Sequence, residues 1–367
     1  MRTRAFQPAR LRLARSLRGL PQNKLAGAVR VTPAAVSQYE SGASTPSEET
    51  LERLAIVLGC APEFFVRPLR SVAAGPPFFR SRRSTPQRER DKAEAYAVAL
   101  SEVATALERW VELPSSISLD TRLDLDPRAG LSAVEDGAND LRAAWRIPSG
   151  PIPNVVRMLE ARGAIVAAVG AFDKRLDAFT LRTYTRPIVV LCSDGGNAAR
   201  RRFDAAHELA HLLLHDGPAD ANHEQEQQAH RFAAALLMPA DEVNPWLPRR
   251  SNELDVLEDG SRTWGVSMQA LLFRARALGT LSEDSYRRAM QRMSAAGWRT
   301  REPVDIGPAE TPELLSRAVA ALPAAGTSLG AIADELGFPT ARLARMLSVP
   351  EERDDAGTGH VVTLRAS

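Results

Sequence analysis

Apolar residues recur every three or four positions over most of the chain, and this spacing predicts amphipathic helices. The longest stripe runs over residues 88–111 and is typical of a core-facing helix or a dimer seam. Five short helical patterns precede it in residues 8–66. Further patterns occupy residues 133–145, 152–162, 223–237 and 312–349. The chain is therefore expected to be mainly helical.

The periodicity changes between residues 164 and 192, where three short runs are rich in β-branched and other apolar residues. They cover residues 164–169, 178–184 and 187–192, and a helical pattern with buried character follows directly. We therefore expect a small sheet within a mainly α protein of the α+β class.

A chain of 367 residues is too long for one ordinary domain. The patterns predict a five-helix N-terminal domain over residues 1–68 and a basic linker over 69–92, where Gly75, Pro76 and Pro77 interrupt regular structure. A central α+β domain is expected over 93–300 and a small helical domain with a mobile tail over 301–367.

Charge is distributed unevenly. Residues 1–90 contain 16 Lys and Arg against 6 Asp and Glu, whereas the remainder contains 31 against 39. A basic head on an acidic body suggests contact with a polyanion, although a solvated basic face is the alternative. Arg80, Arg82 and Arg83 in the linker either add phosphate contacts or are simply solvated.

Other classes of protein are disfavoured. No window of 18 apolar residues exists to span a membrane, and the N-terminus lacks the apolar core of a secretory signal. Cys60 and Cys192 are too few for a disulfide framework. A reducing bacterial cytoplasm is the expected location.

The N-terminal patterns contain two short helices, over residues 22–29 and 32–42, joined by a short turn. Thr32 is a good N-cap, Pro33 suits the first helical position and Gly42 suits the C-terminal stop. Two short helices in this arrangement predict a helix-turn-helix.

The segment resembles the Cro/phage-repressor (XRE) family in VSQYESG at 36–42, Pro46 and LERLA at 51–55. The resemblance implies a double-stranded DNA operator as partner, a homodimer, and a third helix in the major groove. Its groove-facing residues would be Thr32, Pro33, Ala34, Ser37 and Gln38, and Gln22 would face a phosphate. Retention of the fold for protein contacts alone is the alternative.

Five of the six histidines lie between residues 207 and 230, and two of them form the motif HELAH at 207–211. Four-residue spacing puts His207 and His211 on one helical face, about 6 Å apart along the axis, so that both imidazoles can reach one metal ion. Glu208 would meet a metal-bound water. This HExxH pattern is a signature of zinc peptidases.

The third metal ligand must come from elsewhere. His215 lies about 12 Å along the helix axis from His207, too far for one ion. The helix expected over residues 223–237 carries Glu226 on a face with small alanines, which would allow close approach to the first helix. Glu226 is therefore the preferred ligand, and Glu224 is the reserve.

The chain also resembles the ImmA/IrrE metallopeptidase family, in AHELAHLLLH at 206–215, EQQAHRFAAALLMP at 226–239 and WGVSMQAL at 264–271. The resemblance implies a zincin-like domain with Zn²⁺ on His207, His211 and Glu226, and Glu208 as general base. Family members usually carry Asn or Asp at the position of His230.

Several neighbouring side chains have open roles. His230 or His215 would stabilise an oxyanion or would contact and orient the metal ligands. Asp204 is another candidate for orienting the ligands. For each of the three, a purely structural role is the alternative. Cys192 is either a switch ligand or a buried structural thiol. The edge strand beside the motif helix would hold an extended substrate by strand addition.

Residues 329–337 and 340–347 resemble a second helix-turn-helix, with a small packing domain as the alternative. The two resemblances together imply a DNA-binding regulator whose zinc endopeptidase cleaves a repressor protein, or the chain itself, after a stress or a small-molecule or nucleic-acid signal. The alternative is a transcription factor whose peptidase-like domain senses a ligand without proteolysis.

Overall fold

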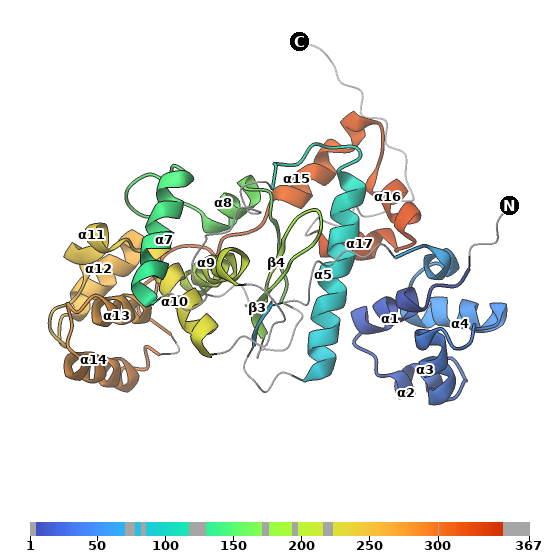
Figure 1. Ribbon diagram of the computed structural model, residues 1–367, viewed down its shortest axis with the longest axis horizontal. Helices are drawn as coiled ribbons and strands as arrows, with labels where there is room; N and C mark the ends of the chain where they lie inside the picture. The colour runs from blue at the N-terminus through green and yellow to red at the C-terminus, as the bar shows by residue number, and fades with distance from the viewer. Residues whose placement is uncertain are drawn as a thin grey trace, which may run out of the picture.

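The computed structural model describes residues 5–69, 78–81, 86–116, 130–170, 176–192, 197–215, 223–299 and 301–347. It is mainly helical with one small mixed sheet, as the periodicity predicted. The sheet lies at the centre of the molecule, with the N-terminal helices at one end and the helices after the motif at the other (Figure 1).

The N-terminal head consists of α1 (Pro8–Leu17), α2 (Gln22–Ala28), α3 (Pro33–Ser41), α4 (Glu48–Leu58) and the 3₁₀ helix η1 (Pro62–Val66). The fifth helical pattern is therefore a 3₁₀ turn. Apolar residues from α1 to α4 are fully buried around one centre, namely Leu11, Leu25, Val36 and Leu54. Thr32 caps α3 by accepting from the Ala35 backbone N–H, and Gly42 ends it in the left-handed region.

The sheet has four strands in the order β1-β3-β4-β2. The three predicted runs form β2 (Ile165–Ala168), β3 (Leu176–Leu181) and β4 (Ile188–Leu191), with β3 antiparallel and β2 parallel to β4. The additional strand β1 (Phe78–Ser81) pairs antiparallel with β3. It comes from the segment predicted to be an unstructured linker, so that part of the linker prediction is corrected.

The two faces of the sheet belong to two cores, because strand side chains alternate. Phe179, Leu181 and Ile188 pack with α5 (Gln87–Leu107), whereas Ala178 and Val189 pack with α8 (Val155–Ala161) and α9 (Ala198–Leu214). Figure 1 shows α5 beside one face of the sheet and α9 beside the other. The apolar stripe predicted over residues 88–111 therefore faces this core as far as Leu107, where α5 ends, whereas Trp110 is 45% exposed.

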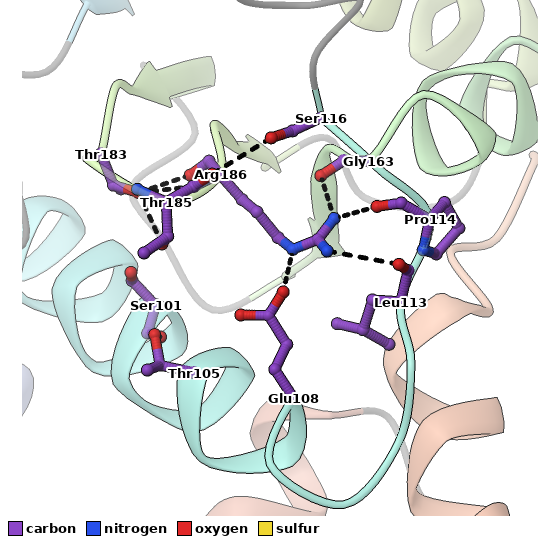
Figure 2. Close-up of polar contacts among 10 residues, drawn as sticks. All are labelled: Ser101, Thr105, Glu108, Leu113, Pro114, Ser116, Gly163, Thr183, Thr185 and Arg186. Carbon is purple, nitrogen blue, oxygen red and sulfur yellow. Dashed lines mark hydrogen bonds and ion pairs between the residues drawn. The ribbon is translucent and has the colours of Figure 1, made fainter.

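Arg186, in the turn between β3 and β4, ties this end of the sheet to the chain that leaves α5 (Figure 2). Its guanidinium pairs with Glu108 and donates to the backbone carbonyls of Leu113, Pro114 and Gly163. One side chain thus satisfies three carbonyls and one carboxylate, which fixes the sheet against α5.

Further helices of the central region extend from α9 away from the sheet. They are α7 (Leu131–Ala144), α10 (His223–Leu237), α11 (Ala240–Val243), the 3₁₀ helix η2 (Asn244–Trp246), α12 (Leu254–Trp264), α13 (Met268–Ala277) and α14 (Glu283–Ala295). Helix α10 lies between α9 and α7, and Glu135 on α7 pairs with Arg231 on α10 and Arg274 on α13. Because its partners hold it on both sides, α10 has a fixed position against α9.

The C-terminal helices are α15 (Leu314–Ala321), the 3₁₀ helix η3 (Pro323–Ala325), α16 (Leu329–Leu336) and α17 (Thr340–Met346). They share one hydrophobic core with α5 and the N-terminal head. The Phe338 ring packs on the Phe64 ring with their centroids 4.9 Å apart and their planes tilted by 53°, and Arg342 donates to the Leu58 carbonyl. The segment expected to form a separate small domain thus packs against the head. The expected tail after residue 347 lies outside the described residues.

Among the described residues, no helix combines the length and the apolar character needed to cross a membrane.

Candidate metal centre and DNA-facing helix

Helix α9 presents the HExxH motif inside the protein. Asn197 caps its N-terminus by accepting from the Arg200 backbone N–H, and most of its residues are buried between the sheet and α10. His207 and His211 are 0% and 1% exposed, and their Nε2 atoms lie 3.0 Å apart. Both imidazoles therefore point at the same place, as the four-residue spacing requires.

Helix α10 brings Glu226 to this place. Its carboxylate oxygens lie 3.4 Å from the Nε2 atoms of His207 and His211. Ala229 and Ala233 on the same helix are fully buried, which is consistent with a close approach of α10 to α9. The three side chains form a group whose ligand atoms lie within 4.8 Å of one another.

This donor group fits a zinc ion. Two imidazole nitrogens and one carboxylate oxygen are typical zinc donors, and bonds of about 2.1 Å in a tetrahedral site place ligand atoms about 3.4 Å apart. The observed separations of 3.0 and 3.4 Å agree with this spacing. Glu226 is also ionised: burial raises its pKa, but hydrogen bonds and charge from His207 and His211 lower it well below the usual range. A deprotonated carboxylate is the form that binds a metal.

Glu208 is fully buried beside this group and points toward the sheet. Its carboxylate accepts a hydrogen bond of 2.7 Å from the Thr180 hydroxyl on β3. Sequence reasoning did not identify Thr180. The alternation of the strand could place residues 178 and 180 on one face, but it could not show that this face meets Glu208.

His215 and Glu224 are not members of the three-residue group, although His215 contacts it. His215 follows the last residue of α9, and its two ring nitrogens contact His211 Nδ1 at 2.9 Å and Gln228 Oε1 at 3.0 Å. Burial, followed by the charge of His211, lowers the pKa of His215 to about 4, so its ring is neutral near pH 7. Glu224 is exposed at the first turn of α10. The structure thus places Glu226, and not Glu224, with His207 and His211.

His230 lies one turn after Glu226 and packs against a metal-facing ring. Its ring centroid is 4.8 Å from that of His207 and 5.6 Å from that of Phe203. Its outer side lines a cavity of about 660 Å³ between α9, α10, α13 and α14. The walls of this cavity include Phe203, Phe273, Tyr286, Trp298 and Arg276. A ligand in the cavity could therefore touch His230, which in turn touches His207.

Asp204 and Cys192 are both buried near the motif. Asp204 lies one turn before Glu208 on α9 and has Arg200 at 3.9 Å. Burial, reinforced by the charge of Glu208, holds the pKa of Cys192 well above its ordinary value. The thiol therefore stays protonated, and it lies outside the metal-binding group found among the described residues.

The residues expected to face DNA gather on α3. Thr32, Pro33, Ala34, Ser37 and Gln38 are all exposed on one end of the head. The C-terminal helices contact η1 and the end of α4, so this surface is left open; Figure 1 shows α2 and α3 away from the rest of the molecule.

Gln22 is placed differently from the expectation. Its side-chain amide donates to Glu40 at 2.8 Å, and Glu40 is buried and paired with Arg15. The buried carboxylate needs donors, so the Gln22 side chain links α2 to α3 inside the head. This corrects the prediction that the side chain points at a phosphate.

Two segments of the chain match known protein families. Residues 11–65 match the family model described as helix-turn-helix, and residues 164–276 match the family model described as the IrrE N-terminal-like domain. Both resemblances noted in the sequence are therefore confirmed over these ranges. No curated protein matches the chain.

Proposed function

We propose that this chain is a bacterial cytoplasmic transcriptional regulator, in which a helix-turn-helix head binds a double-stranded operator and a zinc-dependent endopeptidase domain cleaves a repressor protein or the chain itself. The observation that supports the enzymatic half is the group of His207, His211 and Glu226 beside the buried carboxylate of Glu208. A purely structural helix pair has no reason to bury two imidazoles and the Glu208 carboxylate beside a second carboxylate, because each buried polar group costs free energy of desolvation.

In this proposal His207, His211 and Glu226 hold the ion. A zinc ion held by these residues would supply Lewis acidity, which activates water and polarises a peptide carbonyl. Glu208 accepts the proton of the attacking water, and Thr180 fixes the carboxylate that receives it. His230 supports the ring of His207 from the side and faces the cavity in which part of a substrate would lie.

The DNA-binding half rests on the exposed surface of α3 and the basic character of the head. Gln38 can bond an adenine edge, and Ala34 can contact a thymine methyl. Recognition helices of this kind usually read two half-sites, so a homodimer is part of the proposal. The activating signal is a stress or a small-molecule or nucleic-acid inducer.

The test of proteolysis is incubation of the zinc-loaded chain with a repressor encoded beside its gene. Cleavage by the wild-type chain, its loss in Glu208→Gln, and its loss after removal of the metal by a chelator would support the proposal. Glu258→Gln is the matched control, because Glu258 is a partly exposed glutamate on α12, distant in sequence from the motif. An intact repressor under every inducing condition would contradict it.

A second function, ligand sensing without proteolysis, is favoured by the cavity beside His230. Its volume suits a small organic molecule, and its walls include the aromatic side chains of Phe203, Phe273, Tyr286 and Trp298. The discriminating measurement is operator regulation in a Glu208→Gln strain. A sensor would tolerate this substitution, whereas a peptidase-dependent regulator would lose its response while its affinity for DNA stays the same.

A further inference from the structure

Strand β1 occupies an unusual place for a segment that joins two modules. It lies between the head and α5 in sequence, yet it pairs antiparallel with β3 over Phe78–Thr180, Phe79–Phe179 and Arg80–Ala178. In the described part of the sheet β1 and β2 are the outer strands, so β3 is an interior strand. The expectation that the strand beside the motif helix has a free edge is therefore wrong.

β3 is a strand on which the motif helix α9 packs, and the Thr180 hydroxyl holds the Glu208 carboxylate. The backbone of Phe78 lies opposite Thr180 in the register. β1 therefore runs along β3 beside the residue that positions the proposed base, at the usual spacing of about 4.8 Å between neighbouring strands.

This position has a chemical meaning. An extended peptide binds to a sheet edge by pairing its backbone groups with those of the edge strand, and the edge of β3 would be available for such pairing if β1 were absent. Near this strand His207 and Glu208 are 0% exposed and His211 is 1% exposed, whereas the Glu226 side chain on α10 is 29% exposed.

We propose that residues 78–81 occupy the substrate strand position on β3, so that the chain holds its own peptidase site closed until β1 leaves the sheet. The preferred occupant is an extended peptide with the sequence of residues 78–81, because the backbone of this segment pairs with β3. That this position takes a substrate rests on the proposed peptidase function, whereas the displacement of β1 from β3 does not.

Two adjacent proline substitutions provide a matched pair. Successive N–H groups of a strand point alternately toward the partner strand and away from it, so only one of Phe78→Pro and Phe79→Pro removes a β1–β3 hydrogen bond. The double variant also lacks this bond. Hydrogen exchange of the β3 amides, measured in the metal-free full chain, reports the pairing independently of activity.

We expect the amides of β3 that face β1 to exchange at least tenfold faster than in the wild-type chain when the bonded residue is replaced. This applies to the double variant and to one of the single variants. The other single variant should exchange at the wild-type rate. The β4 amides should stay protected. Equal exchange in all variants would show that β1 does not cover β3. Loss of protection that spreads to β4 would show that β1 is a permanent part of the fold, and either result would overturn the proposal.

A peptide-binding experiment tests whether β1 occupies a position on β3 that a separate peptide can take. A fluorescent peptide with the sequence of residues 76–83 is titrated into full chains that carry Glu208→Gln, with and without the two prolines, and its anisotropy is followed. We expect at least tenfold tighter binding to the chain with the prolines. Equal binding, or no binding to either chain, would contradict occupancy of a peptide site. Neither measurement needs turnover, so absence of repressor cleavage would refute the proposed enzyme and leave the strand result standing.

Discussion

At the scale of single residues, the contact between Thr180 and Glu208 determines where the proposed base points. The hydroxyl donates to the carboxylate at 2.7 Å in a site from which solvent is excluded. Glu208 is not placed by the motif spacing alone, because a glutamate at that helix position could take several rotamers. A residue on the sheet therefore orients a residue on the helix.

Thr180→Val is predicted to lower the free energy of unfolding by about 1–3 kcal/mol, because a buried carboxylate loses a donor. The same substitution should reduce kcat about tenfold, while zinc content stays unchanged because Thr180 is not a ligand. Thr180→Ser keeps the hydroxyl and should behave like wild type. Urea denaturation and repressor-cleavage rates measure the two effects; a Val variant as stable as the Ser variant would show that the hydrogen bond does not matter.

Local spacing explains which site residues could be predicted. The positions of His207 and His211 on one face follow from helix geometry alone, and so does the exclusion of His215. The choice between Glu224 and Glu226 depends on how α10 docks against α9, which the small alanines indicated only in part. Thr180 depends on a contact between residues 28 apart in sequence, and no local pattern reveals such a contact.

At the scale of elements, the C-terminal helices support the head that begins the chain. The Ala61 backbone N–H donates to the Gly337 carbonyl, Arg67 donates to the Asp334 carbonyl, and Phe338 is buried against Phe64. The folded head is thus stabilised by residues about 270 positions later.

Phe338→Ala is predicted to destabilise the head although it lies far from the head in sequence. Removal of a buried phenylalanine ring costs about 3–5 kcal/mol. Amide exchange over residues 11–65 should therefore accelerate. Thr340→Ala changes an exposed residue next to the same contact and serves as control. Unchanged exchange in the head would mean that the C-terminal helices do not support it.

The helices were largely predictable as elements because apolar periodicity is a local property, and α10 begins and ends where the pattern predicted. Strand β1 was not predictable, because glycine and prolines precede it and its pairing partner β3 lies about 100 residues away. The packing of α16 and α17 against the head was also not predicted. An amphipathic pattern shows that one face of a helix is buried, but it does not show which element covers that face.

At the scale of the whole molecule, a basic head precedes a peptidase-like body, and the exposed surface of α3 is directed away from that body. Binding of the chain to its own promoter region should be specific and weaken steeply with salt, because phosphate contacts release counterions. Gln38→Ala should weaken specific binding by about 1–3 kcal/mol, and the exposed Glu52→Gln should not. A gel shift without a specific, salt-sensitive complex would contradict DNA recognition.

The central claim is that α9 and α10 together build one metal centre, and metal analysis of the purified full chain tests it most directly. The donor group predicts about one zinc ion per chain for the wild type and for Glu224→Gln, whose side chain lies outside the group. Glu226→Gln, which removes a charged donor of the same size, should retain far less zinc after dialysis. Full zinc retention by Glu226→Gln, or no zinc in the wild-type chain, would contradict the account.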